Sequence, residues 1–178
     1  MPDGSGFNGP GRGSEAETFV PGPDRLRALR SALGRFATGV TVVTTQSADG
    51  PVGITANSFS SLSLDPPLVI WSPARGSRRF PVFAEAAVFS IHVLGAAQGD
   101  LAARFVRDGR DFAGLDAHPN AEGVPILPGC LARFDCRREV VHDGGDHALI
   151  VGRVLRAAVD DGAPLVFSAG RYGSFTPF

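Results

Sequence analysis

The segment from Thr55 to Pro66 has the composition best suited to binding chemistry. Its twelve residues include five hydroxyls, one amide and one carboxylate, and an apolar run follows the proline pair. A core strand rarely carries so many short polar groups, because each buried hydroxyl without a partner costs roughly 1–3 kcal/mol. Short polar side chains on extended backbone suit a flat ligand with polar edges. We therefore expect a ligand-binding surface along this segment.

The loop Ser72–Arg79 carries three arginines, a glycine and Ser77 ahead of a predicted helix. Backbone N–H groups, the helix dipole and guanidinium charge all favour an anion at such a position. A short basic loop is also commonly a solvated surface. The loop alone leaves both interpretations open.

The segment His142–His147 contains two histidines and two aspartates, which are residue types that bind metals. They flank a Gly-Gly turn, and no third clustered ligand follows. We therefore predict no metal site here. His147 at the head of a strand is either a turn residue or a hydrogen-bond donor to a ligand.

Five phrases along the chain resemble the short-chain flavin reductases, and together they span roughly Leu26 to Phe175. These are the NAD(P)H:flavin oxidoreductases that supply reduced flavin to two-component monooxygenases. The phrases are RFATGVTVVTT, GITANSFSSLSLDPPLV, the basic loop, the Gly-Asp-His at 145–147 and the Arg-Tyr-Gly at 171–173. The resemblance implies an FMN-binding split barrel. This fold is mainly β, an antiparallel Greek-key barrel with a few peripheral helices. The resemblance also implies that two copies pair as a homodimer.

The resemblance also implies which residues meet the cofactors. Those expected to bind the flavin are Thr38, Gly39, Val40, Thr55, Ala56, Asn57, Ser58, Ser61, Ser72, Arg75, Ser77, Arg79 and Phe105. Those expected on the nicotinamide side are His147, Arg171 and Tyr172. No side chain is expected to be catalytic, because the hydride passes between cofactors.

The implied function is NAD(P)H-dependent reduction of FMN or FAD, with the reduced flavin leaving for a partner oxygenase. The sequence leaves open which flavin and which of NADH and NADPH are used. Two alternatives remain: a non-catalytic flavin-binding split barrel, and a relative of the pyridoxamine-phosphate oxidases. The reductase phrases favour the first function.

Composition limits the other classes of function. A chain of 178 residues is about one domain, and a net charge of −1 gives no reason to expect nucleic acid. All basic residues are arginine, so no lysine can form a Schiff base. No run of 18 apolar residues predicts a membrane span, no signal peptide is evident, and a cytoplasmic location is expected. Cys130 and Cys136 lie roughly 20 Å apart along one predicted strand, too far for a disulfide.

The elements that must position these residues are mostly short strands. Residues 1–22, rich in glycine and proline, are predicted to be a disordered tail, and residues 23–178 to be the folded domain. A helix capped by Asp24 is predicted to run to Gly39, with further helices at 77–84 and 98–107 and an irregular excursion at 108–128. In the strand at 130–142, polar residues alternate with apolar ones, which predicts one mostly polar face. Strands are predicted at 40–45, 52–56, 59–64, 68–72, 87–94, 130–142, 147–158 and 165–168. Together these strands predict an antiparallel barrel.

Overall fold

The computed structural model describes residues 16–177, which fall into two units, Met1–Leu33 and Gly34–Phe178. In the first unit a 3-10 turn, Pro23–Arg25, leads into helix α1, Leu26–Leu33. Gly22 precedes this turn without a side-chain cap, so the prediction of Asp24 as the N-cap is wrong. The helix also ends six residues before Gly39. Most of the predicted disordered tail lies outside the described residues.

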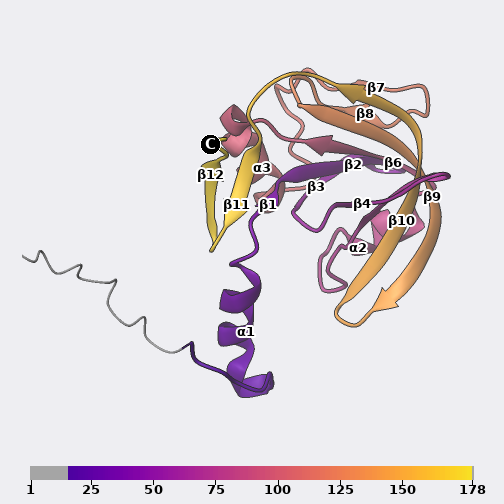
Figure 1. Ribbon diagram of the computed structural model, residues 1–178. Helices are drawn as coiled ribbons and strands as arrows, with labels where there is room; N and C mark the ends of the chain where they lie inside the picture. Colours follow the sequence, from indigo (N-terminus) through magenta and orange to yellow (C-terminus); the bar gives the residue numbers. More distant parts are fainter. Residues whose placement is uncertain (1–15, 178) are drawn as a thin grey trace, which may run out of the picture. The chain divides into compact units, whose positions relative to one another are not determined.

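The second unit is built on a seven-stranded sheet in which every pairing is antiparallel (Figure 1). The predicted antiparallel, mainly β fold with a few helices is therefore confirmed. Across the sheet, the strands lie in the order β3 (Gly50–Ala56), β2 (Thr41–Ser47), β6 (Val88–Val93), β9 (Ala132–Gly144), β10 (His147–Val159), β5 (Pro67–Trp71) and β4 (Ser60–Leu64).

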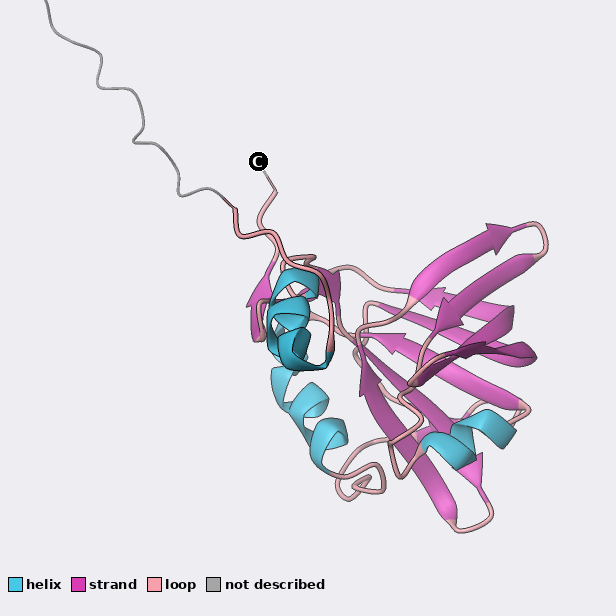
Figure 2. Cartoon of the chain, turned by 90° about the horizontal axis from the view of Figure 1, so that it is seen from below, coloured by secondary structure: helices cyan, strands magenta, loops and turns pink. Residues whose placement is uncertain are grey.

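The two edge strands of this sheet, β3 and β4, are joined by only three residues, 57–59. Three residues span about 10 Å, so the sheet must curl until its edges come close (Figure 2). No pairing between β3 and β4 occurs in the described part of the chain. A curled sheet with unpaired edges agrees with the expected split barrel.

Two small sheets complete the unit, and neither was predicted in full. Thr38–Gly39, predicted as the end of the first helix, is strand β1, which pairs with β11, Leu165–Ser168. A further strand, β12 (Arg171–Ser174), pairs with β11, and the excursion contains the short pair β7 (His118–Pro119) and β8 (Pro125–Ile126).

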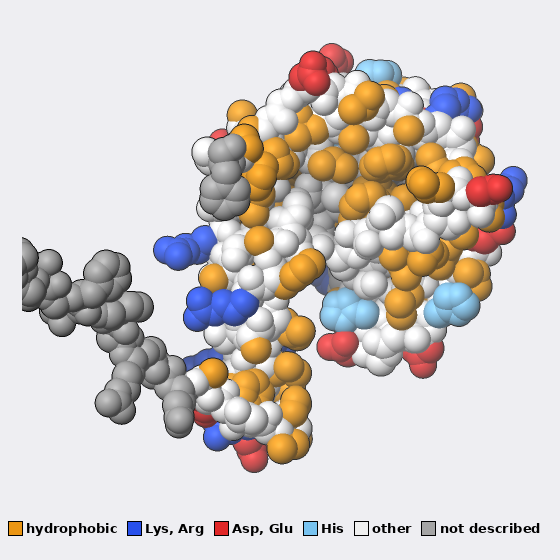
Figure 3. All heavy atoms as spheres, in the orientation of Figure 1, with side chains coloured by type: hydrophobic (Ala, Val, Ile, Leu, Met, Phe, Trp, Pro, Cys, Tyr) orange, Lys and Arg blue, Asp and Glu red, His pale blue; other side chains and the backbone are white. Residues whose placement is uncertain are grey.

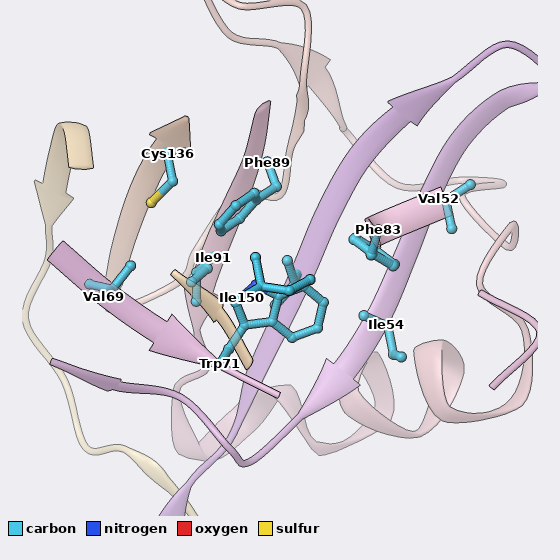
Figure 4. Close-up of a cluster of buried hydrophobic side chains, with 10 residues drawn as sticks. Val52, Ile54, Val69, Trp71, Phe83, Phe89, Ile91, Cys136 and Ile150 are labelled. Carbon is cyan, nitrogen blue, oxygen red and sulfur yellow. The ribbon is translucent and has the colours of Figure 1, made fainter. Parts of the chain in front are cut away.

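The interior of the curled sheet is filled by one aromatic and aliphatic cluster (Figure 4). Helix α2, Phe80–Glu85, inserts Phe83 edge-on against Trp71, with ring centroids 5.2 Å apart. A second cluster packs α3, Gly99–Arg107, against the sheet through Ala102 and Phe105. The 3-10 turn Ala96–Gln98 leads into α3.

Asp135 lies on the face of its strand that was predicted to be mostly polar, and its side chain is buried. Its residue exposure is 1 %, and the Ser90 hydroxyl donates to its carboxylate at 2.7 Å. The Arg133 guanidinium lies 3.1 Å from the same oxygen. The pairing of β9 with β10 shifts register between Val154 and Arg156, which places Arg156 opposite Asp135. We call the charged and polar group around this carboxylate the Asp135 cluster: Ser90, Asn120, Glu122, Arg133, Asp135 and Arg156.

His92, to which the sequence assigned no role, is fully buried beside this cluster. Its Nδ1 lies 3.0 Å from the Val42 carbonyl, and its Nε2 accepts from the Leu127 N–H at 3.1 Å. Burial lowers the pKa of His92 to about 4, so the ring is neutral. The ring thereby ties the end of the excursion to the sheet.

Both cysteines are free, so the prediction of no disulfide is confirmed. Burial raises the pKa of Cys136 to about 12, and its thiol is a core group. No helix among residues 16–177 is long and apolar enough to span a membrane.

Candidate functional site

A small hollow brings together residues from three of the predicted groups. It has a volume of about 150 Å³, and we call it the Tyr172 hollow. Residues from β3, the end of α3 and the β11–β12 hairpin form it. Its lining is Val40, Thr55, Ala56, Asn57, Val106, Phe167 and Tyr172.

The polar residues of the Thr55–Pro66 segment are used in different ways. Thr55 donates its hydroxyl to the Ala102 carbonyl at 2.7 Å, which ties β3 to α3. Ser58 donates to the Ser72 carbonyl and accepts from the Ser72 N–H, which ties the segment to the basic loop. Ser61 is exposed on β4 and lines neither this hollow nor the arginine pocket described below. The Asn57 amide is therefore the exposed polar group of this set that faces the hollow.

Thr38 offers a second polar group beside the hollow. Its hydroxyl is buried, and among the described residues it has no hydrogen-bond partner. Its neighbour Val40 and its cross-strand partner Phe167 both line the hollow. A buried hydroxyl without a partner costs free energy, so this atom is suited to a ligand that reaches it.

The basic loop is fastened to the β9–β10 turn. The Arg75 N–H donates to the Asp146 carbonyl at 2.9 Å, and its guanidinium pairs with Asp143 at 2.6 Å. The same guanidinium lies over the Phe80 ring at 5.4 Å. Ser77 accepts from the Arg79 N–H, and α2 begins only at Phe80, three residues later than predicted. Arg75 thus already has an anionic partner within the chain, whereas Arg79 lines the neighbouring pocket and Ser77 lies two residues before it.

That pocket has a volume of about 420 Å³, and we call it the arginine pocket. Arg79 donates to the Val106 carbonyl at 3.1 Å, and burial lowers the pKa of its guanidinium. A Cβ on Gly109 would lie 2.5 Å from Arg79 Nε, so the pocket wall is closely packed there. The lining is Val52, Arg78, Arg79, Val82, Arg107, Asp108, Gly109 and Arg110. The sequence reasoning missed Arg107 and Arg110, although the basic last turn of α3 was a signal for Arg107.

The three residues expected on the nicotinamide side lie in three places. Tyr172 lines the Tyr172 hollow and packs on Phe167, with ring centroids 5.4 Å apart. Arg171 lines a separate surface hollow of about 520 Å³ together with Arg35. His147 lies beside the basic loop in an isolated bridge with Ala74, and its Nδ1 is 2.7 Å from Asp146 Oδ1.

Phe105 was expected among the flavin-binding residues, and the structure places its ring in the core. The ring is 0 % exposed and packs against Phe112 with centroids 5.0 Å apart. It also fills the space beside Gly53, where a Cβ would lie 2.6 Å from the ring. Its role is to support β3 beneath the Tyr172 hollow and the arginine pocket.

These features fit a flavin nucleotide. The apolar walls of Val40, Phe167 and Tyr172 suit a flat aromatic ring, and Thr38 and Asn57 supply polar groups for its edge. Guanidinium groups of the adjoining pocket suit a phosphate. Among the described residues, no group of three or more potential metal ligands is close enough to hold an ion.

The family model of the flavin reductase like domain matches residues 33–176. The chain therefore belongs to the flavin reductase like family. This result confirms the resemblance found in the sequence.

Individual relatives are similar over most of their length. The FMN reductase (NADH) SmoA of Agrobacterium fabrum is 60 % identical over 158 residues, which cover 89 % of this chain and 91 % of that protein. The reductase subunit HsaB of a flavin-dependent monooxygenase from Rhodococcus jostii is 42 % identical over 153 residues, covering 85 % and 78 %.

A solved structure gives the same result. The NADH:FAD oxidoreductase SgcE6 of Streptomyces globisporus, in complex with NAD and FAD fragments, superimposes with a TM-score of 0.83 at 34 % identity. The match covers 90 % of this chain and 98 % of that one.

Proposed function

We propose that this protein is an NADH-dependent flavin reductase that releases reduced flavin to a partner monooxygenase. The observation that carries the proposal is the adjacency of the Tyr172 hollow and the arginine pocket, which suits a ring and its phosphate. Relatives named as an NADH-dependent FMN reductase and as reductase subunits of monooxygenases support it. NADPH as the alternative coenzyme and a cytoplasmic location belong to the same proposal.

The chain's own contribution to this reaction is binding and orientation. When bound, the flavin supplies the hydride-accepting chemistry, so the protein needs no nucleophile. Val40, Phe167 and Tyr172 would cover one part of a bound ring and exclude water from it. Thr38 and Asn57 would hold the ring edge by hydrogen bonds, and Ser77 with Arg79 would hold the phosphate. Such fixed positioning is what a transfer between two stacked rings requires.

The purified protein mixed with FMN and NADH tests this function, with loss of the nicotinamide absorbance as the readout. We expect rapid oxidation of NADH that does not change when a chelator is added. Flavin binding without oxidation of NADH or NADPH would instead favour the non-catalytic flavin-binding alternative. The family match gives no support to a pyridoxamine-phosphate oxidase.

The phosphate assignment has its own test in the double variant Ser77→Ala/Arg79→Ala. It is expected to weaken FMN binding far more than riboflavin binding, because riboflavin has no phosphate. Equal weakening of both flavins would show that the phosphate is held elsewhere.

We propose that His147 contacts the nicotinamide coenzyme. Its side chain is 43 % exposed, and its Nδ1 faces Asp146, which leaves Nε2 for a ligand. His147→Ala is expected to raise the Michaelis constant for NADH between a few-fold and about a hundredfold, with flavin affinity nearly unchanged. Unchanged coenzyme kinetics with a lowered melting temperature would leave His147 as a turn residue.

We also propose that the protein is a homodimer. Figure 3 shows hydrophobic side chains gathered over a face of the β-rich unit, and several of the large ones are well exposed. The exposed large hydrophobic residues of this unit include Leu64 at 95 % and Val159 at 89 % exposure, with Leu62, Val140 and Leu155 at 39–51 %. Burial of such residues between two copies would stabilise a pair. Light scattering from the purified chain tests this, and a monomeric mass would contradict it.

A further inference from the structure

A third hollow lies between the β2–β3 hairpin and the excursion at 108–128, and we call it the Phe112 hollow. It has a volume of about 280 Å³, and it shares no lining residue with the Tyr172 hollow or the arginine pocket. A cavity of about 150 Å³ holds benzene, so this hollow has room for a molecule of one or two aromatic rings. Most of its lining is apolar: Pro51, Phe112, Leu115, Ala117, Pro119 and Pro125.

Contacts within the chain hold the walls of the Phe112 hollow in place. The Thr44 hydroxyl donates to the Pro125 carbonyl at 2.6 Å, and this bond is buried. Asn120 Oδ1 accepts from two backbone N–H groups of the β7–β8 turn, at 3.0 and 2.9 Å. The Phe112 ring packs edge-on against the buried Phe105, with centroids 5.0 Å apart. The hollow is therefore formed before a ligand arrives, which reduces the entropy lost on binding.

The lining of the Phe112 hollow carries no permanent charge, in contrast to that of the arginine pocket. Among the described residues it contains no arginine, aspartate or glutamate, whereas four arginines and Asp108 line the arginine pocket. A charged ligand would be desolvated in the Phe112 hollow without an opposite charge in the lining. The hollow therefore favours an uncharged ligand, and its phenylalanine and proline surfaces suit a flat aromatic ring.

Two polar side chains that line this hollow have hydrogen-bonding groups that the fold does not use. The His118 imidazole is exposed, and among the described residues it makes no hydrogen bond or ion pair. Gln46 donates from its amide nitrogen to the Ser47 carbonyl at 3.2 Å, and its amide oxygen has no partner in the described part of the chain. An imidazole and an amide oxygen are enough to orient a ring that carries a hydroxyl or an N–H group.

We propose that the Phe112 hollow is a second ligand site, for a small uncharged aromatic molecule that carries one hydrogen-bonding group. The apolar walls receive the ring, and His118 with Gln46 orients the polar group. Since this hollow and the two parts of the flavin site have no lining residue in common, both sites can be occupied in the same molecule. The inference does not depend on the proposed reductase function.

Calorimetric titration of the full chain with 2-naphthol tests this proposal, with FMN in both solutions to fill the Tyr172 hollow. At about pH 7.5, where an ordinary histidine is mostly neutral, we expect a dissociation constant of about 1 mM or below. The probe 2-naphthoate has the same rings and a carboxylate, and it should bind at least about tenfold more weakly. Equal binding of the two probes would overturn the proposal. Loss of 2-naphthol binding when FMN is added would also overturn it, because the probe would then lie in the flavin site.

Two variants with matched controls locate the bound probe. Ala117→Leu fills the hollow from its half-buried wall and should weaken 2-naphthol binding at least about tenfold, whereas Ala113→Leu, on an exposed residue outside the lining, should not change it. His118→Ala removes an exposed side chain and should weaken binding about two- to tenfold, with no change in His142→Ala. Equal affinities within either pair would overturn the proposal. A chain that binds 2-naphthol in this way yet oxidises no NADH would contradict only the proposed function.

Discussion

Two groups of charged residues in this molecule differ in how their charge is balanced. In the Asp135 cluster, the carboxylate accepts from Ser90 and faces Arg133, with Arg156 3.9 Å away. In the arginine pocket, the guanidinium groups of Arg78 and Arg107 form no ion pair among the described residues, and Asp108 is the one carboxylate in a lining with four arginines. Charges compensated within the chain hold the fold, whereas a gathering of uncompensated charge suits an outside ligand. The comparison predicts that changes in the first group lower stability and that changes in the second lower affinity.

The largest effect is expected from Asp135→Ala. The carboxylate is 2 % exposed, and its removal leaves the half-buried Arg133 guanidinium without its partner. Loss of one member of a buried pair costs about 3–5 kcal/mol of the free energy of unfolding. Urea unfolding measures this, with Asp49→Ala as the control, because Asp49 is 84 % exposed. A loss as small as that of the control would show that the Asp135 cluster does not hold the fold.

Gly109→Ala tests whether backbone packing sets the shape of the arginine pocket. The added Cβ would lie 2.7 Å from the Gly53 carbonyl and 2.5 Å from Arg79 Nε. Relief of this overlap is expected to cost about 3 kcal/mol and to displace Arg79, which weakens FMN binding. Gly99→Ala is the matched control, because no atom lies within 4 Å of a Cβ there. If both variants had the same stability and the same FMN affinity, backbone packing at Gly109 would not set the shape of the arginine pocket.

The sequence predicted the antiparallel fold, because β-branched and apolar runs separated by turn residues depend on local chemistry. It ran the first helix to Gly39, because the partner strand of Thr38–Gly39, β11, lies more than 120 residues further along the chain. It did not predict the burial of Asp135, because the partner Ser90 comes from a strand 45 residues earlier. Both features depend on tertiary pairing, which a local pattern does not show.

The candidate site shows the same limit. The residues around Thr55–Asn57 and Tyr172 were identified from short motifs, and the structure places them in one hollow. Arg107 and Arg110 escaped notice, because their meeting with Arg79 depends on how α3 packs across β3. Phe105 was assigned to the ligand by motif alone, whereas burial assigns its ring to the core.

His92 gives the Asp135 region a dependence on pH. Burial lowers its folded-state pKa to about 4, below the value near 6.5 expected when unfolded. Between these two values the unfolded chain binds more protons than the folded one. The contribution of neutral His92 to the free energy of unfolding is therefore complete above pH 6.5 and is lost as the pH falls towards 4. We expect the free energy of unfolding to drop by about 2 kcal/mol between pH 7 and pH 5. Urea titrations at both pH values measure it, and His92→Gln should show a smaller drop; an equal drop in the variant would assign the dependence to other groups.

The smallest effect is expected from Glu122→Gln, at the rim of the Asp135 cluster. Arg156 donates to both Glu122 oxygens, at 2.7 and 2.8 Å, and these bonds lower the pKa of Glu122. The ionised Glu122 therefore contributes to the free energy of unfolding at neutral pH, and this contribution is lost as the pH falls through its lowered pKa. Because the Arg156 side chain is 50 % exposed, solvent and salt screen the pair. We expect a loss of stability well below that of Asp135→Ala, measurable in dilute buffer and reduced in 1 M NaCl. An equal loss of stability in Glu122→Gln and Asp135→Ala would show that the exposed rim of the Asp135 cluster stabilises the fold as much as its buried centre. Burial would then not explain why this cluster, unlike the arginine pocket, holds the fold.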